Sequence, residues 1–186
     1  MIIGVIGSIA SGKDKIADFF AKKYGFKKIL ISNFLREEAE KQEIPVEGRY
    51  VLLRIQAELR RKNGEDYLVK LALQKIRDNK WENVVINGLR TPFDVLEAKR
   101  RLKARIILVN AKPEIRFQRQ KKRHRKGFQK TYEQFLQEEA IENGALQFYK
   151  SVKMAQIKID NNGSLRDLEK KAEIIAKKLG LKKKKK

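Results

Sequence analysis

Residues 2–13 read IIGVIGSIASGK, and this stretch decides the fold. The apolar, β-branched run at residues 2–7 predicts a buried strand. Apolar residues recur at helical spacing over residues 14–24, so an amphipathic helix is expected to follow. Between the two, residues 7–13 fit the pattern G-x-x-x-x-G-K. Glycines allow the backbone to approach a phosphate closely, and N–H groups of the loop and the helix N-terminus bind it. The alternative interpretation is a strand-to-helix turn that uses glycine for its shape alone.

The loop predicts a binding site for the phosphates of ATP. Lys13 supplies a point charge at the β- and γ-phosphates, so we also expect it to be catalytic. Position 14 departs from the pattern, in which a Ser or Thr hydroxyl ligates Mg²⁺. Asp14 offers a carboxylate, which is a hard oxygen ligand, and we expect it to bind Mg²⁺; alternatively it only stabilises the helix N-terminus. The residues predicted to bind ATP are Gly7, Ser8, Ile9, Ala10, Ser11, Gly12, Lys13 and Asp14.

The rest of the chain alternates strands with helices. Further strands are expected at 28–31, 83–88, 105–110 and 157–160. Helices are expected at 33–42, 50–62 and 65–79, from Pro92, from Pro113, and at 164–179. This alternation predicts an α/β protein, a three-layer αβα sandwich around a five-stranded parallel sheet. We expect one domain over residues 1–181, followed by a disordered lysine run at 182–186.

The composition excludes several classes of function. The 186 residues include no Cys, which excludes disulfides and thiolate chemistry, and a single His argues against a zinc enzyme. No apolar run approaches the roughly 20 residues that span a bilayer, and Met1 leads directly into an apolar run without a signal-peptide pattern. A cytoplasmic protein without a membrane partner is expected. The net charge of +22 favours polyanionic partners.

The loop GSIASGKD with the helix IADFFAKKYGF resembles the P-loop nucleoside and nucleotide kinases. It is most similar to the subset with Gly-Lys-Asp, which includes phage-type deoxynucleoside monophosphate kinases and animal-type phosphomevalonate kinases. In the phage-type enzymes a Thr usually follows the Asp, whereas this chain has Lys15. The resemblance covers residues 1–180 and implies transfer of the γ-phosphoryl group of ATP to a small phosphorylated acceptor. A nucleoside or deoxynucleoside monophosphate is the acceptor we expect.

The resemblance also implies an acceptor site. The stretch SNFLR after the second strand is similar to adenylate-kinase-like enzymes, which makes Arg36 a clamp for the acceptor phosphate, with Asn33 beside it. Arg60, in AELRRKNG, lies in the helical acceptor-binding insertion expected at about 32–79. At the end of the third strand, where related kinases read Asp-Gly-x-Arg, this chain has Asn87 in place of the acid and keeps Arg90. Arg90 is therefore implied as a catalytic and acceptor-binding residue. For each arginine the alternative is a structural or solvated side chain.

A basic segment, residues 116–130, is expected to form a lid. Adenylate-kinase-like enzymes place a mobile lid here, whose arginines neutralise the transferring phosphoryl group. Arg119 and Arg123 are four residues apart and share a helix face, so both are implied as catalytic. An RNA-binding patch or a solvated basic helix is the alternative.

The stretch IKIDNNGSL resembles the segment after the last strand of dephospho-CoA kinases, which packs beside adenine. By this match Asn161 and Gly163 are implied as ATP contacts; an Asx-type turn before a Ser164 helix cap is the alternative. The match keeps dephospho-CoA kinase open as a second enzymatic function. A nucleotide-gated RNA- or ribosome-binding protein is the rival from another class, because of the charge of +22. Compositional bias without any polyanionic partner is a third interpretation. The quaternary state is expected to be a monomer or a homodimer.

Overall fold

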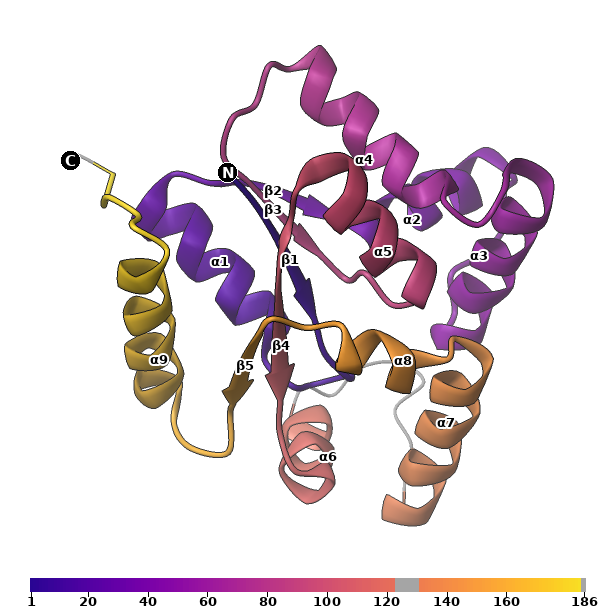
Figure 1. The fold of residues 1–186 in the computed structure, drawn as a ribbon. Helices are drawn as coiled ribbons and strands as arrows, with labels where there is room; N and C mark the ends of the chain where they lie inside the picture. The colour runs from indigo at the N-terminus through magenta and orange to yellow at the C-terminus, as the bar shows by residue number, and fades with distance from the viewer. Residues whose placement is uncertain (123–130, 185–186) are drawn as a thin grey trace.

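The computed structural model describes residues 1–122 and 131–184, and only the backbone of Arg49. Its five strands form one parallel sheet in the order β2-β3-β1-β4-β5, which confirms the predicted sheet (Figure 1). The strands are β1 (Ile2–Ile6), β2 (Lys27–Leu30), β3 (Val84–Asn87), β4 (Arg105–Asn110) and β5 (Ile157–Asp160). β1 lies in the middle of the sheet, where Ile3 pairs with Val85 of β3 and with Arg105 of β4.

Helices cover both faces of the sheet, as the sandwich prediction requires. One face carries α1 (Lys13–Tyr24) and α9 (Leu165–Lys178). The other carries α2 (Ile31–Lys41), α3 (Arg49–Asn63), α4 (Tyr67–Asp78), α5 (Pro92–Leu102) and α8 (Phe148–Lys153). Two more helices, α6 (Pro113–Lys122) and α7 (Tyr132–Ala145), extend beyond the carboxyl ends of the strands (Figure 1). No helix within residues 1–122 and 131–184 is long and apolar enough to cross a membrane.

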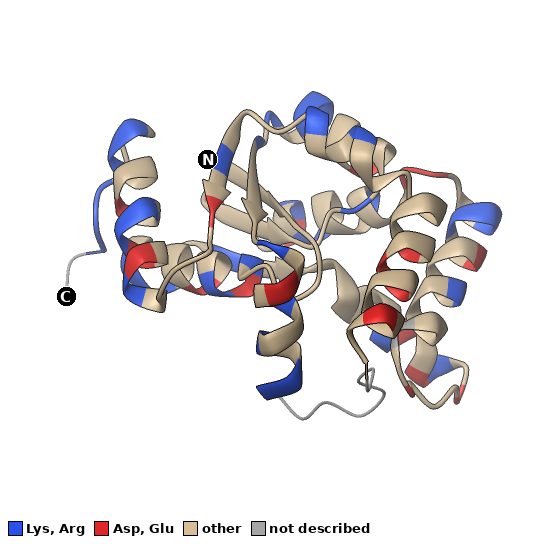
Figure 2. Cartoon of the chain, turned by 90° about the horizontal axis from the view of Figure 1, so that it is seen from below, with Lys and Arg blue, Asp and Glu red and all other residues tan. Residues whose placement is uncertain are grey.

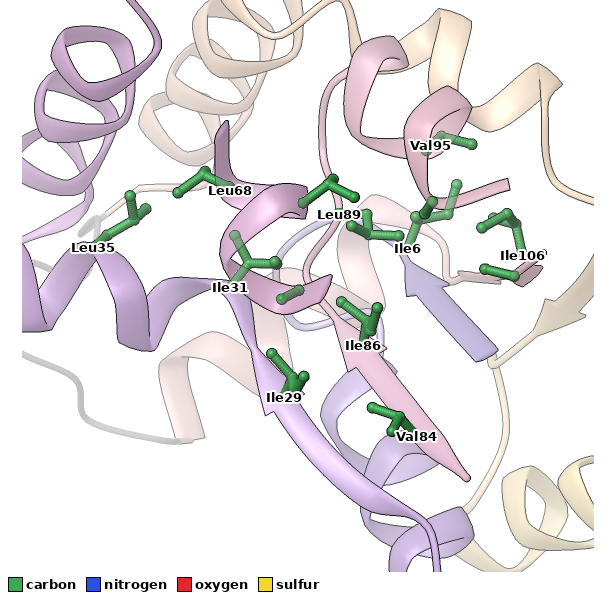
Figure 3. Close-up of a cluster of buried hydrophobic side chains, with 14 of the residues drawn as sticks. Ile6, Ile29, Ile31, Leu35, Leu68, Val84, Ile86, Leu89, Val95 and Ile106 are labelled. Carbon is green, nitrogen blue, oxygen red and sulfur yellow. The ribbon is translucent and has the colours of Figure 1, made fainter. Parts of the chain in front are cut away.

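The sheet separates two hydrophobic clusters. Successive side chains of a strand point to opposite faces, so Ile6 packs toward the α5 side and Val5 toward α1 and α9. Figure 3 shows the larger cluster, in which Leu35 of α2 and Leu68 of α4 extend the core beyond the sheet. Because both faces are covered, the central strands are apolar at almost every position.

The helix boundaries follow capping signals in the sequence. Ser164 accepts a hydrogen bond from the N–H of Asp167 and caps α9, which confirms its predicted capping role. Thr91 caps α5 in the same way, with Pro92 at the first helical position. α2 begins at Ile31, directly after β2 and two residues before the predicted start.

The sequence did not predict α7 and α8. In α7, Phe135 is buried whereas Leu136 and Ile141 are exposed, so its apolar residues do not mark a single face. α8 has six residues, fewer than two full turns, which is too short to produce a helical period.

Candidate functional site

The phosphate loop, residues 7–13, joins β1 to α1 at the carboxyl edge of the sheet. A side chain at Gly7 would place its Cβ 2.5 Å from the carbonyl oxygen of Val109. Gly12 caps α1 with a φ of 101°, a left-handed conformation that other residues rarely adopt. The loop therefore requires both glycines for its shape, and it presents the N-terminus of α1 beside Lys13, the first helical residue.

Asn161, after β5, holds the phosphate loop from behind. Its side-chain N–H donates to the carbonyl oxygen of the fully buried Ser11 at 2.7 Å. Its own backbone N–H donates to the carbonyl of Asn110 at 2.7 Å, so the contact links the loop to β4 and β5. Asn161 is 5% exposed and does not line the cavity described below. The structure thus gives Asn161 a loop-positioning contact, and its predicted contact with adenine stays a prediction.

Asp14 and Asn87 meet at the carboxyl edge of the sheet. The amide nitrogen of Asn87 donates to the carboxylate of Asp14 at 2.7 Å, across 73 residues of sequence. β1 and β3 are adjacent parallel strands, so the start of α1 and the end of β3 lie side by side. An Asp at position 87 would set two carboxylates at this distance, whereas the Asn amide stabilises the ionised Asp14. Asp14 and Asn87, the two residues that depart from the pattern of related kinases, are therefore in direct contact with each other.

A cavity of about 500 Å³ opens beside this pair. Lys13, Asp14 and Asn87 line it, together with apolar side chains of α2 and α3. Further lining residues are Ile9, Lys28, Leu30, Ile31, Ser32, Asn33, Leu35, Arg36, Val46, Gly48, Leu52, Leu53, Gln56, Gly88, Arg90, Gln120 and Glu142. The predicted acceptor residues Asn33, Arg36 and Arg90 thus face the same cavity as the phosphate loop.

Arg36 is exposed on α2, and no ion pair neutralises its guanidinium within the described part of the chain.

Arg90 is held more tightly than Arg36. Its guanidinium forms an ion pair with the buried carboxylate of Glu142 on α7. Its backbone N–H donates to Asp94 at 3.1 Å, and its carbonyl accepts from the Ser151 hydroxyl at 2.9 Å. Arg90 is therefore fixed at the cavity by residues of α5, α7 and α8.

Arg60 does not reach the cavity. Its guanidinium donates to the buried carboxylate of Asp94 at 2.7 Å and to the backbone carbonyl of Glu65. Arg60 is 6% exposed, so this contact is a buried ion pair between α3 and α5. Asp94 also completes the cap of α5 and accepts from the backbone of Arg90. Arg60 therefore fixes α3, which forms part of the cavity wall, against α5. Arg60 itself does not line the cavity, so its predicted contact with the acceptor has no support there.

The predicted lid lies partly outside the described residues. Residues 116–122 belong to α6, whereas Arg123 and the remainder of the lid to residue 130 are not described. Arg119 donates to the backbone carbonyls of Asn161 and Gly163, at 3.0 and 3.2 Å. It therefore rests on the loop after β5, next to the phosphate loop. A short hydrogen-bond network continues there, because the Ser164 hydroxyl and N–H bind Asp167 and lower the pKa of that carboxyl.

Three buried polar residues of the cavity were missed by sequence reasoning. Gln56 of α3, Gln120 of α6 and Glu142 of α7 line the cavity and are at most 7% exposed. The Gln56 amide nitrogen and the Gln120 amide oxygen have no hydrogen-bond partner among the described residues. Only Glu142 carried a signal, as one acid of a stretch that follows a basic one.

Comparisons with known proteins show the family and the fold of the chain. A family model described as an AAA domain matches residues 6–137. A UPF0200 protein of Pyrococcus horikoshii is 32% identical, over 96% of this chain and 97% of the relative. A UPF0200 protein of Thermococcus sibiricus is 33% identical, over 99% of this chain and 98% of the relative. The chain belongs to this AAA-domain family and to the UPF0200 proteins.

Solved structures show the same fold. A shikimate kinase from Bacteroides thetaiotaomicron has a TM-score of 0.62 at 20% identity, covering 97% of this chain and 99% of that one. The protein TT1252 from Thermus thermophilus has a TM-score of 0.60 at 24% identity, covering 96% and 97%. This UPF0200 chain thus has the fold of the P-loop kinases. The fold that the resemblance of the loop implied is confirmed.

Replacing Asn161 tests its contact with the phosphate loop. Asn161→Ala leaves the buried carbonyl of Ser11 without its donor, which costs about 1–3 kcal/mol of stability. We expect a lower midpoint in urea unfolding and weaker ATP binding in calorimetry. Asn162→Ala is the matched control, because its side chain makes an exposed hydrogen bond to Lys112. Equal effects of the two variants would contradict the positioning role of Asn161.

Proposed function

We propose that this chain is an ATP-dependent kinase whose acceptor is a small phosphorylated molecule, most simply a nucleoside or deoxynucleoside monophosphate. One observation carries the proposal: a single cavity joins Lys13 of the phosphate loop to the arginines Arg36 and Arg90. Transfer from ATP to a phosphorylated acceptor brings two anionic substrates together, and this cavity is lined by Lys13 and by both arginines.

Transfer requires positioning and electrostatic stabilisation more than proton chemistry. In the proposed complex, the N–H groups of the loop and Lys13 bind the β- and γ-phosphates of ATP. Arg36 and Arg90 hold the acceptor phosphate, because a guanidinium binds phosphate through two parallel hydrogen bonds. The acceptor oxygen then attacks the γ-phosphorus in line, and ADP leaves. Arg119 would supply positive charge to the transferring group, and the same role predicted for Arg123 lies outside the described residues.

Asp14 and Asn87, which line the cavity, fit a bound Mg²⁺. Asp14 brings a carboxylate to the cavity, and the buried amide oxygen of Asn87 has no hydrogen-bond partner among the described residues. Both are hard oxygen ligands of the kind that Mg²⁺ or its water shell prefers. Residues 1–122 and 131–184 hold no cluster of three potential metal ligands, so nucleotide phosphates and water would have to supply the other ligands of the ion. When bound, Mg²⁺ would neutralise charge on the phosphates.

The cavity wall supports an acceptor with a flat apolar body. Leu35, Leu52 and Leu53 line it, and the buried amides of Gln56 and Gln120 interrupt it. An apolar wall with a few fixed amide groups suits a nucleobase, whose ring packs on aliphatic side chains and whose edge carries donors and acceptors. Dephospho-CoA, the acceptor of the alternative kinase function, presents the same phosphate and base chemistry and belongs in the same assay.

ADP release measured against a panel of acceptors tests the proposal. The panel holds the nucleoside and deoxynucleoside monophosphates, dephospho-CoA, phosphomevalonate and shikimate, each with ATP and Mg²⁺. We expect turnover with a monophosphate and a loss of at least about 100-fold in Lys13→Ala, because the variant removes the charge at the transferring phosphate. Lys15→Ala is the matched control, because Lys15 is exposed and does not line the cavity.

Turnover with shikimate alone would contradict the proposed acceptor class. ATP binding without turnover on any acceptor would contradict the kinase function itself.

Removing Arg36 should affect acceptor binding selectively. A charge-assisted hydrogen bond contributes about 1.5–3 kcal/mol, so Arg36→Ala should raise the KM for the acceptor about 10- to 100-fold. The KM for ATP should stay within about twofold, since Arg36 lies at the acceptor end. Lys41→Ala, on the exposed surface of the same helix, is the control and should change neither constant. A rise in the KM for ATP alone would assign Arg36 to the nucleotide end.

The contact between Asp14 and Asn87 can be tested by exchanging the two groups. Asp14→Ala should abolish Mg²⁺-dependent turnover, and Asn87→Asp should impair it by placing two carboxylates together. The double variant Asp14→Thr, Asn87→Asp carries a hydroxyl and one carboxylate, the pattern of related kinases, and should recover activity relative to Asn87→Asp. Steady-state rates across Mg²⁺ concentrations measure this coupling. Additive effects in the double variant would show that the two residues act independently.

A further inference from the structure

The positive charge of the chain is concentrated at the end of the sheet opposite the cavity. Four segments lie there, 22–27, 77–83, 99–105 and 177–184, and we call them together the basic edge. They hold fifteen lysines and arginines and two acids, Asp78 and Glu82. The greater part of the net charge of +22 therefore lies in less than a sixth of the sequence.

The topology makes these segments neighbours. In a parallel α/β sheet the strands begin, and the helices that precede them end, at one edge. Lys27 opens β2 and pairs with Val84 at the start of β3, while Arg105 opens β4 beside β1. The C-terminal segment joins them, because the N–H of Lys184 donates to the carbonyl of Lys23 at 2.9 Å. Figure 1 shows both termini at this edge, away from α6.

Part of this charge is neutralised locally. Lys183 pairs with Glu173 at 2.9 Å, and Arg100 and Arg101 both bind Glu97 and lower the pKa of its carboxyl to about 2. Residues 182–184 of the terminal run, predicted as disordered, thus include contacts to the folded body; Lys185 and Lys186 lie outside the described residues. Each segment also carries exposed cations that form no ion pair within residues 1–122 and 131–184, among them Lys22, Lys27, Lys80, Lys103, Arg105, Lys178 and Lys182.

Helix dipoles explain only some of these cations. Lys22 and Lys178 lie in the last turns of α1 and α9, where positive charge stabilises the helix. Lys103 is the C-cap of α5 and Lys80 follows the C-cap of α4, so the helix dipole favours these two as well. Lys27 and Arg105 begin strands, where no helix dipole stabilises a positive charge. Clustering them raises their mutual repulsion, which a bound polyanion relieves.

The chemistry of the edge suits a phosphate backbone. Lysines dominate it, and they bind phosphates as point charges without reading a sequence. The exposed aromatic residues Tyr50, Phe93 and Tyr149 lie on other segments. The aromatic residues of the four segments, Tyr24, Phe26 and Trp81, are buried or packed against the core, so phosphate contacts rather than base stacking are expected here. These segments also lack the large exposed apolar side chains that anchor a protein in a bilayer, and only Met1 lies nearby.

We propose that the basic edge binds nucleic acid through its phosphate backbone, without sequence preference. The edge and the cavity lie at opposite ends of the strands, so polyanion binding and nucleotide binding occur independently. The proposal thus goes beyond the kinase function and stands without it.

Fluorescence anisotropy of a labelled RNA duplex, titrated at several KCl concentrations, tests the proposal. The edge variant replaces Lys27, Lys80, Lys103 and Lys182 by Gln. The control variant replaces Lys41, Lys62, Lys70 and Lys150 by Gln, exposed residues elsewhere that remove the same charge. We expect the edge variant to raise the Kd at least tenfold and to reduce the slope of log Kd against log [KCl] by about 0.9 for each phosphate that it no longer neutralises. The control should change the Kd less than about threefold.

Four outcomes would overturn the proposal. Three belong to the RNA titration: no binding by the unaltered chain at about 100 mM KCl, an equal weakening in both variants, and competition of saturating ATP with RNA, which would place RNA in the cavity. The fourth outcome is binding to vesicles of phosphatidylcholine with phosphatidylserine in preference to RNA. That result would assign the edge to membranes. Thermal unfolding and ATP calorimetry on both variants verify that fold and cavity are intact, so a failure of the kinase proposal is detected separately.

Discussion

The pairing of β1 with β3 on one side and β4 on the other is the constraint on which the site depends. Because these strands are parallel and adjacent, their carboxyl ends bring the phosphate loop, Asn87 and the loop after β5 to one edge. The hydrogen bond from Asn87 to Asp14 and the one from Asn161 to Ser11 then fix the loop from two sides. A loop held in this way keeps its N–H groups oriented before a phosphate arrives, which avoids an ordering cost on binding.

The acceptor wall is fixed by a second set of buried polar contacts. The Asp94 carboxylate accepts hydrogen bonds from the Arg60 guanidinium of α3 and from the backbone N–H of Arg90. Glu142 of α7 forms an ion pair with the Arg90 guanidinium. Buried ion pairs contribute little net stability but are costly to break, so their main effect here is to fix geometry. Arg90 is therefore oriented by residues of α5, α7 and α8, whereas Arg36 lines the cavity and stays exposed to solvent.

The two ends of the sheet carry different chemistry. At the carboxyl end, Arg60 and Arg90 are paired with the carboxylates of Asp94 and Glu142. At the other end, lysines collect on strand starts and turns with few acids, and Figure 2 shows Lys and Arg along α9 and the chain that leads to the C-terminus. A discrete anion suits the first arrangement, since paired charges define one geometry. An extended polyanion suits the second, since its charges are spread over several segments.

The sequence by itself determined the phosphate loop, the strand and helix order and the parallel sheet, because these depend on local patterns: glycine spacing, β-branched runs and caps such as Ser164. The family resemblance of the sequence implied Asn33, Arg36 and Arg90 as acceptor residues, and the structure shows that all three line one cavity. The partners of each side chain were decided by the tertiary structure alone. Arg60 and Arg90 look alike in the sequence, yet one is committed to Asp94 and the other faces the cavity. Gln56, Gln120 and Glu142 carry no motif, because burial depends on which helix packs over them, and helix packing is a property of the whole chain.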